Sequence, residues 1–402
     1  MRLWMRLKDY FKTKSNLSSI ALLSFLRGAR DNMRLVIWQP FILSLGLSMK
    51  VLGAFESMII LTMILVQPIL GSISDSYGRK HLLVIRELLM LFALILCAYT
   101  KTWHLLLFTV LFIGLSMAFE PVYNTLVAES SDQTNLGMTF SILNATYMAS
   151  GLIAPVFAGL LADSYGYSYV FYSTIVLGML SLLIVQVKLV ETKSQDDKLR
   201  LSISLKSLVK TFNPPPHLRG FYISMIVDSV FFGLGFKLLY GMLSEGYGYT
   251  SSMLGLLATA LTGAWAVSQI PLGRFLDRVG YKYYIIISQL MSCVILALLL
   301  FTQSFELVIV MHIVMGVATA MWVPAEQAWI TSNVDPNERA RAIGSYYAVK
   351  GLLSIPSPFL GGLLYDSYSY SVPILLNLIG AIIDVILIAT LVKENKNYLF
   401  KK

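Results

Sequence analysis

The chain has 402 residues, of which 56% are hydrophobic and only 13% are charged, whereas soluble domains carry about 25% charged residues. This composition excludes an ordinary soluble protein and indicates an integral membrane protein. The net charge of +9 would suggest nucleic-acid binding in a soluble chain, but the basic residues gather in alternate loops, which is the positive-inside pattern, so we expect a lipid bilayer and no nucleic acid as partner.

The start of the chain, Met1–Lys14, is basic and amphipathic, without a small-residue cleavage site after an apolar core. We therefore expect residues 1–20 to be a cytoplasmic N-terminal segment lying on the membrane surface rather than a signal peptide. Apolar segments follow, each near the length of about 20 residues that crosses the hydrocarbon core as a helix. An isolated strand cannot satisfy its backbone groups in lipid, so each segment is predicted to be helical. The twelve predicted helices cover residues 22–47, 51–73, 82–100, 103–127, 137–162, 167–190, 219–243, 252–274, 283–302, 305–331, 340–364 and 370–392.

A polar stretch at mid-chain, residues 191–217, ends in three consecutive prolines, which cannot continue a helix. We predict it to be a cytoplasmic linker between two six-helix halves, residues 21–190 and 218–392. Residues 393–402 are then a cytoplasmic tail. Most loop Lys and Arg residues fall on one side, so both termini are predicted to be cytoplasmic. The loop Glu129–Asn135 breaks this pattern, since it is acidic although it should lie inside.

A short polar turn between the second and third apolar segments, Gly71–Lys80, returns between the eighth and ninth as Gly273–Lys282. Glycine, Asp, glycine and Lys recur in the same register, 202 positions apart, which indicates a duplicated structure. The pattern resembles the cytoplasmic loop motif of the major facilitator superfamily (MFS). This resemblance implies an all-α integral membrane protein with twelve transmembrane helices in two pseudo-symmetric six-helix halves. In that family the loop is a conformational latch, and the residues implied are Gly71, Asp75, Gly78, Arg79, Lys80, Gly273, Asp277, Gly280 and Lys282.

The alternative for this turn is a solvated loop with a few charges, but its duplication favours the latch. The second copy has Tyr281 where the first has Arg79, so we expect a weaker latch there. A second pattern, Gly151–Gly159, is similar to the glycine- and proline-rich helix-5 motif of exporting MFS members, with a counterpart in helix 11. Small residues at such positions let helices pack closely. The residues of this helix-5 and helix-11 motif are Gly151, Pro155, Gly159, Pro358, Gly361 and Gly362.

The first apolar segment carries four charges, Arg27, Arg30, Asp31 and Arg34, at i, i+3, i+4 and i+7, which places them on one stripe of a helix. The uncharged remainder is too short to span alone, so at least three of these charges are expected inside the membrane, where such groups face a cavity and pair. Asp31 precedes a proline by nine residues, a spacing similar to the helix-1 motif of drug-exporting MFS members, whose acid responds to protons. We predict Asp31 to be the protonated carboxylate and Arg30 or Arg34 its partner. The alternative is a ring of charges near the cytoplasmic surface.

Further polar groups fall inside predicted helices. In the MFS, helices 1, 4, 7 and 10 line the central cavity, so the resemblance ranks the groups on these helices first. His312 can titrate near neutral pH, although a lone histidine is more often a packing residue. Glu120 and Glu326 are expected to form an inner gate or else helix-packing pairs, and the sequence gives no role to Asp384. The predicted substrate or proton pathway consists of Arg30, Asp31, Arg34, Glu120, Asp228, Lys237, His312, Trp322 and Glu326.

Neither an enzyme nor a metal site is indicated. Cys97 and Cys293 both fall inside predicted helices, so a disulfide is not expected, and no metal-ligand spacing occurs. No phosphate-binding Walker loop and no nucleophile motif is present. We therefore expect no catalytic activity, no metal and no cofactor, with a proton gradient as the driving force.

The resemblance implies a secondary transporter of the plasma membrane that moves a small-molecule substrate by alternating access, and we expect a monomer. The helix-5 motif and Asp31 favour proton-coupled efflux of small amphipathic or toxic compounds. Val110 stands where many members carry a helix-4 arginine associated with proton coupling, so coupling is expected from helix 1. One alternative is an uptake permease for a nutrient or organic anion, with Arg34, Lys237 and Lys350 supplying positive potential. The other is a non-transporting membrane sensor.

Overall fold

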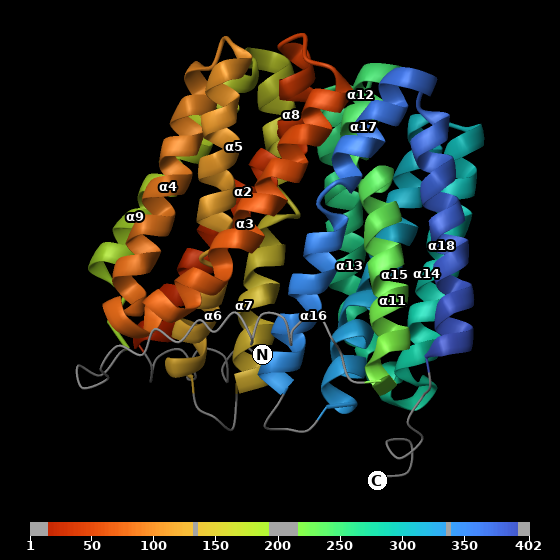
Figure 1. Cartoon of the computed structure of the whole chain (residues 1–402). Helices are drawn as coiled ribbons and strands as arrows, with labels where there is room; N and C mark the ends of the chain where they lie inside the picture. Colours follow the sequence, from red (N-terminus) through yellow and green to blue (C-terminus); the bar gives the residue numbers. More distant parts are fainter. Residues whose placement is uncertain (1–14, 132–135, 193–215, 335–338, 393–402) are drawn as a thin grey trace. The chain divides into compact units, whose positions relative to one another are not determined.

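The computed structural model of the chain describes residues 15–131, 136–192, 216–334 and 339–392 (Figure 1). Within these ranges every element is helical and no strand occurs, which confirms the predicted all-α fold class. The predicted N-terminal segment up to residue 14, the linker from 193 to 215 and the tail from 393 lie outside the described residues.

The chain divides into two compact units, of which the first comprises Met1–Ile37 and Met58–Ile203. In this unit α4 packs between α5 and α9, and the three helices lie side by side in Figure 1. Apolar side chains from α2, α4, α6 and α9 form its buried core. Its elements are α2 (Ser15–Ser44), α3 (Met49–Tyr77), α4 (Arg79–Tyr99), α5 (Trp103–Met117), α6 (Glu120–Glu129), α7 (Leu136–Ser150), α8 (Ala154–Tyr165) and α9 (Tyr167–Val187). Of the first two helices, only α2 up to residue 37 and α3 from residue 58 belong to this unit.

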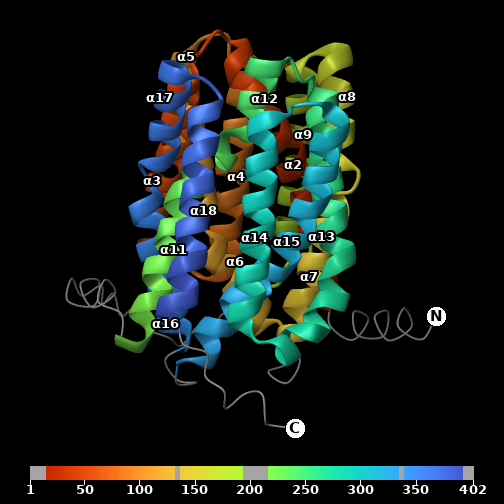
Figure 2. The same cartoon turned by 90° about the vertical axis from the view of Figure 1, so that its right-hand side faces the viewer.

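The second unit comprises Trp38–Ser57 and Ser204–Lys402. Here α18 packs against α11 and α14, as Figure 2 shows, and α15 packs against α13 and α14. The stacked rings of Phe221 and Trp329, whose centroids are 4.0 Å apart, lie in its core beside Tyr346. Besides the ends of α2 and α3, its elements are α11 (Pro216–Leu234), η2 (Phe236–Leu238), α12 (Leu239–Tyr247), α13 (Ser251–Val279), α14 (Tyr281–Phe301), α15 (Phe305–Ser332), α16 (Arg339–Ser354), α17 (Ser357–Tyr368) and α18 (Ser371–Leu391).

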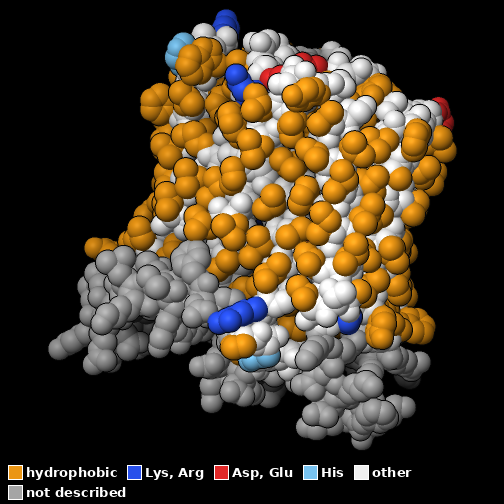
Figure 3. All heavy atoms as spheres, turned by 45° about the vertical axis from the view of Figure 1, so that its right-hand side comes forward, with side chains coloured by type: hydrophobic (Ala, Val, Ile, Leu, Met, Phe, Trp, Pro, Cys, Tyr) orange, Lys and Arg blue, Asp and Glu red, His pale blue; other side chains and the backbone are white. Residues whose placement is uncertain are grey.

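Ten helical segments of the described chain are long and apolar enough to cross a membrane. Two predicted spans are not among them. One is α2, which carries four charges, and the other is the pair α16–α17, whose first helix carries three basic residues. With these two, the helices coincide with the twelve predicted segments. Large apolar side chains remain exposed, Val267 to 78% and Phe301 to 86%, which suits contact with lipid tails. In Figure 3 hydrophobic side chains cover the middle of the visible face, and charged ones lie towards its two ends.

Several spans are broken at positions that the sequence explains. The break between α5 and α6 precedes Pro121, and the break between α7 and α8 precedes Pro155, because proline has no N–H to continue the helix. Between α11 and α12 the chain passes through η2, where the backbone N–H of Phe236 donates to Asn377 Oδ1 at 3.0 Å. Broken helices are tolerated in a membrane when neighbouring groups satisfy the freed backbone in this way.

Residues 38–57 group with the second unit rather than with the predicted N-terminal half, residues 21–190. Asp366 accepts hydrogen bonds from the first backbone N–H groups of α3, those of Met49 at 3.2 Å and Lys50 at 2.9 Å. A carboxylate is favoured at such a helix N-terminus. Gln39 donates to the carbonyl of Lys237 at 2.8 Å and accepts from the N–H of Gly241 at 2.6 Å. These polar contacts tie the segment to α12 and α17.

Candidate functional site

Charged side chains from α2, α4 and α6 meet inside the first unit. Arg27, Arg30, Asp31 and Arg34 lie along one side of α2, as their spacing predicts, and they face two charges of α4 and one of α6. Glu120 was predicted to belong to the substrate or proton pathway, whereas the α4 pair, Arg86 and Glu87, was not predicted. We call this set the arginine cluster: Arg27, Arg30, Asp31, Arg34, Arg86, Glu87 and Glu120.

Most members of the arginine cluster are paired. Arg30, which is 1% exposed, donates from Nη1 to Glu87 Oε2 at 2.5 Å and from Nε to Asp31 Oδ1 at 3.0 Å. Oε2 of Glu120 accepts hydrogen bonds from Nη2 of Arg27 at 3.1 Å and from Nη2 of Arg86 at 2.7 Å. The Asp31 carboxylate is therefore held by Arg30 in an environment that three further guanidinium groups make more positive.

Arg34 differs from the other arginines of the cluster. It is 5% exposed, and within the described part of the chain it forms no ion pair. Its Nε has no hydrogen-bond partner, and Nε and Nη1 of Arg86 have none either. Arg34 and Arg86 line a cavity of about 380 Å³ together with Arg27, Asp31 and Glu120. Methionine and aromatic side chains complete its wall, among them Met63, Met90, Met117, Phe140 and Tyr147.

A second charged set lies inside the second unit and combines α11, α15, α16 and α18. Lys350 Nζ donates to Glu326 Oε1 at 2.7 Å, and the hydroxyl of Tyr346 donates to the same oxygen. Gln289 donates to Asp228 Oδ1 at 2.8 Å. Asp384 is fully buried, accepts from Ser224, and has no partner at Oδ2 among the described residues. We call Asp228, Glu326, Lys350 and Asp384 the carboxylate cluster.

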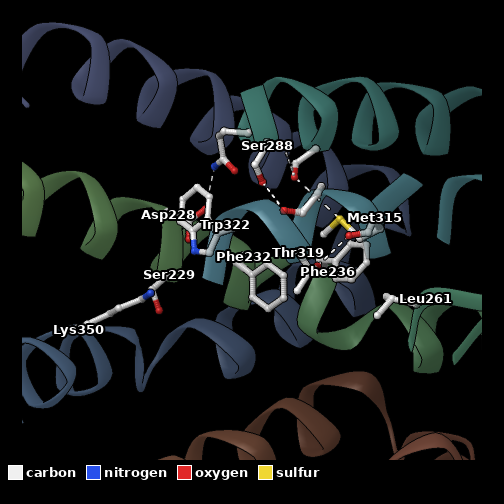
Figure 4. Close-up of a pocket in the computed structure, with 13 residues that line it drawn as sticks. Asp228, Ser229, Phe232, Phe236, Leu261, Ser288, Met315, Thr319, Trp322 and Lys350 are labelled. Atoms are coloured by element: carbon white, nitrogen blue, oxygen red, sulfur yellow. Dashed lines mark hydrogen bonds between the residues drawn. The ribbon is translucent and has the colours of Figure 1, made fainter. Parts of the chain in front are cut away.

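A cavity of about 460 Å³ opens beside the carboxylate cluster. Asp228 and Lys350 supply its charge, and Gln289 and Ser288 add neutral polar groups. Figure 4 shows these side chains with the large apolar groups of the wall, which come mainly from α11 and α15. The large side chains of that wall are Phe232, Phe236, Met315 and Trp322. A cavity with a few polar groups in an aromatic wall is typical of sites for small amphipathic molecules.

Two predicted pathway residues, Lys237 and His312, belong to neither cluster. Lys237 pairs with Glu56 at 3.4 Å, so its charge is compensated. His312 is 2% exposed; Nδ1 donates to the carbonyl of Val308 at 2.8 Å, and the ring packs near Tyr240, with centroids 5.9 Å apart. It lines neither cavity. These contacts match the packing alternative for this histidine.

Arg79 and Lys80 of the first latch motif contact two acidic residues, Glu129 and Glu191. Arg79 donates to the carbonyl of Ser74 near the end of α3 and pairs at 3.0 Å with Glu129, the last residue of α6, so this acidic residue faces a buried arginine. Glu191 accepts from the N–H groups of Arg79 at 2.8 Å and Lys80 at 3.0 Å, which covers the start of α4.

The second copy differs. Lys282 Nζ donates to the carbonyls of Ala389 and Val392 at the end of α18, at 2.7 and 2.8 Å. Gly78 and Gly280 both have positive φ, +88° and +98°, which only glycine adopts without strain. Gly71, Asp75 and Asp277 lie outside the residues whose side-chain surroundings are described.

The helix-5 and helix-11 motif lies at close helix contacts. Gly361 packs against the backbone of Leu234 in α11, and Gly362 against that of Met49, so neither position has room for a Cβ atom. On the first unit, Gly151 lies in the break between α7 and α8, and Pro155 and Gly159 are buried in α8. Small residues therefore set the approach of the helices in this part of the second unit, as they commonly do in membranes.

The comparisons with known proteins agree with this architecture. The sequence profile described as Major Facilitator Superfamily matches residues 20–242 and again residues 223–399. The chain belongs to the major facilitator superfamily. It is thus a multi-pass membrane transporter by family, with the helical arrangement that the duplicated loop motif predicts.

Proteins similar to this MFS chain include multidrug resistance proteins. It is 24% identical over 367 residues to the multidrug resistance protein MdtG of Citrobacter koseri, covering 89% of this chain and 90% of the relative. To MdtG of Escherichia coli it is 24% identical over 323 residues, covering 79% and 78%.

Solved structures show the same fold at low identity. The nucleoside transporter NupG gives a TM-score of 0.75 at 16% identity, covering 96% of this chain and 99% of that one. The human organic anion transporter MFSD10 gives 0.69 at 14% identity, covering 93% and 99%. The D-xylose-proton symporter gives 0.74 at 14% identity, covering 93% and 97%. These likenesses concern the fold alone.

Four groups of the two sites were missed by the sequence analysis: Arg86, Glu87, Gln289 and Tyr346. All lie on helices that the family resemblance does not rank as cavity-lining. A usable signal was present, because a charged pair such as Arg86 and Glu87 within an apolar span is costly unless it has partners. The partners themselves come from α2 and α6, far away in the sequence.

Proposed function

We propose that this MFS transporter exports small amphipathic compounds from the cell in exchange for protons. The observation that carries the proposal is the carboxylate cluster, in which three buried or half-buried carboxylates share one basic group beside an aromatic cavity. The relatives named as multidrug resistance proteins support the direction and the broad class of cargo.

The exchangeable proton is assigned to Asp228 and its neighbours by charge balance. Lys350 lines the same cavity as Asp228, and its ammonium group is already paired with Glu326 at 2.7 Å. Ionising all three carboxylates would leave buried negative charge without a partner, which is costly in a medium of low polarity. The cluster is therefore expected to hold a proton. Asp228 lines the cavity, so it is the member from which cargo can displace that proton.

The sequence prediction gave this role to Asp31, and its surroundings favour a different one. Asp31 pairs with Arg30 at 3.0 Å and belongs to a cluster with more arginines than carboxylates. Opposite charges nearby stabilise the ionised form of a carboxylate. We therefore keep Asp31 as a positioning residue for Arg30 and place proton exchange on Asp228.

Proton flux in inverted vesicles with an acidic interior tests both assignments. Cationic, neutral and anionic amphipathic compounds are added in turn to wild type, Asp228→Asn and Asp31→Asn. We expect an exported compound to collapse the pH gradient with wild type and with Asp31→Asn, but not with Asp228→Asn. The reverse pattern would return the proton site to helix 1. No response to any compound with any variant would refute proton exchange itself.

An uptake permease for an organic anion is the second candidate, favoured by the unpaired Arg34. Lys237 and Lys350, the other cations of that hypothesis, are compensated by Glu56 and Glu326. Accumulation of a labelled organic anion against its gradient in intact cells would support uptake over export.

We also propose the plasma membrane as the site of this transporter, with both termini in the cytoplasm. The basic loops support this orientation through the positive-inside rule. A reporter fused after Lys402 should be active only on the cytoplasmic side. Activity on the outside would reverse the topology.

A further inference from the structure

We propose that the cavity of the arginine cluster binds the oxyanion group of an amphipathic organic acid, with Arg34 and Arg86 as its contacts. The proposal rests on the transport function, since the ligand is taken to be cargo, and it names the chemical class of that cargo. It requires no particular coupling ion.

The first argument is charge. Four guanidinium groups, Arg27, Arg30, Arg34 and Arg86, face three carboxylates, Asp31, Glu87 and Glu120. Arginine does not lose its proton in proteins, so this site cannot neutralise itself as the carboxylate cluster does. One positive charge remains without a carboxylate in the described structure. An isolated buried charge is costly, and a bound monoanion would compensate it.

The second argument is geometry. Arg34 and Arg86 are each 5% exposed, both line the cavity, and their unpartnered nitrogen atoms are Nε of each and Nη1 of Arg86. A guanidinium N–H donates a charge-assisted hydrogen bond to an oxygen of a carboxylate or phosphonate. The remaining nitrogen of the Arg86 guanidinium, Nη2, already donates to Glu120 Oε2 at 2.7 Å. This contact holds the guanidinium in place while leaving donors for a ligand.

The third argument is the wall of the cavity. Its volume of about 380 Å³ lies within the range of small-molecule sites. Beyond the arginines the lining is largely apolar and includes Met63, Met90 and Leu143. Methionine side chains adapt to different apolar shapes. The cavity therefore suits a molecule with one acidic group and an apolar body.

Ligand-induced stabilisation of the purified full chain in detergent tests this site without any proton gradient. The probes are naphthoate, naphthylmethanol and naphthylmethylamine, which share a ring system and differ in charge. A ligand that binds the folded state raises the unfolding midpoint in proportion to ln(1 + [L]/Kd). We expect a saturable rise with naphthoate and a smaller rise or none with the alcohol and the amine.

Variants then assign the contacts. Arg34→Gln should weaken the apparent affinity for naphthoate about tenfold or more, equal to about 1.4 kcal/mol, while Arg34→Lys should lose less because the charge remains. Arg219→Gln, at an exposed arginine of α11, is the matched control and should respond as wild type. Without ligand, Arg34→Gln should unfold at or above the wild-type midpoint, since it removes an uncompensated charge.

Equal shifts with all three probes, or a naphthoate response unchanged in Arg34→Gln, would overturn the anion site. The comparison of the three probes needs only the wild-type protein, so the proposal stays testable even if a variant does not fold. Failure of proton exchange in vesicles alongside a charge-selective response here would refute the coupling and leave the anion site standing.

Discussion

Removing Lys350 should destabilise the protein more than removing its partner Glu326. The two atoms of this ion pair, Nζ and Oε1, are 2.7 Å apart, and the side chains are 17% and 7% exposed. At this distance the direct attraction is about 6 kcal/mol for an effective dielectric constant of about 20. Desolvation of both groups offsets much of it, and breaking a buried pair by removing one partner costs about 3–5 kcal/mol. We expect a loss in that range for Lys350→Met.

The asymmetry follows from the neighbours that remain. After Lys350→Met, Glu326 keeps only the hydroxyl of Tyr346 as a described partner, with Asp228 nearby. After Glu326→Gln, Lys350 still acts on Asp228, which lines the same cavity. The loss for Glu326→Gln should therefore be smaller, about 1–2 kcal/mol, and the double variant should lie within about 1 kcal/mol of wild type, because replacing a whole buried pair is often neutral.

Unfolding by sodium dodecyl sulfate, followed with a thiol-reactive fluorophore, measures these differences. Cys97 in α4 is 1% exposed, so it should react only on unfolding, whereas Cys293 is half-buried and is replaced by serine in every variant. The double-mutant cycle then isolates the coupling between the two side chains. Equal losses of unfolding free energy for the two single variants would refute the idea that Lys350 compensates more than one carboxylate. A double variant no more stable than Lys350→Met would refute it as well.

Three further predictions concern other parts of the molecule. Gly78→Ala should lower transport and stability. Its backbone, at φ +88° and ψ 154°, lies in a region that costs other residues about 1–3 kcal/mol, and the new Cβ would lie 2.5 Å from Glu191 Oε2. Gly46→Ala, also at positive φ but with nothing within 4 Å, should show the backbone strain alone, so equal stability losses would exclude the Glu191 contact. His312→Gln should leave the pH profile of vesicle transport unchanged, since the ring lines neither cavity, and a shifted profile would make it a proton carrier. Glu120→Gln should strengthen the naphthoate response in the stabilisation assay by freeing Arg27 and Arg86, whereas a weaker response would place the anion elsewhere.

Much of the fold follows from local features of the sequence. Apolar runs of spanning length predict helices because lipid leaves the backbone no other partner, and the positions of Pro121 and Pro155 mark where those helices break. The duplicated turn reveals the family, since glycine with positive φ, as at Gly78 and Gly280, is a requirement of the backbone itself. The stripe of charges on α2 is equally local, because helical periodicity alone aligns Arg27, Arg30, Asp31 and Arg34.

What each charge does was decided only by the tertiary structure. Asp31 was predicted to carry a proton because its position before Pro40 resembles a helix-1 motif of drug-exporting MFS members, yet Arg30 and the arginines around it favour its ionised form. Asp384 has no role in the sequence, but it shares the carboxylate cluster with Asp228 once α18 packs against α11. The physical reason is that the protonation and pairing of a buried group depend on the charges within a few ångströms, and those charges come from helices distant in sequence. The sequence therefore determines that charges enter the membrane, and packing determines which of them remain unpaired.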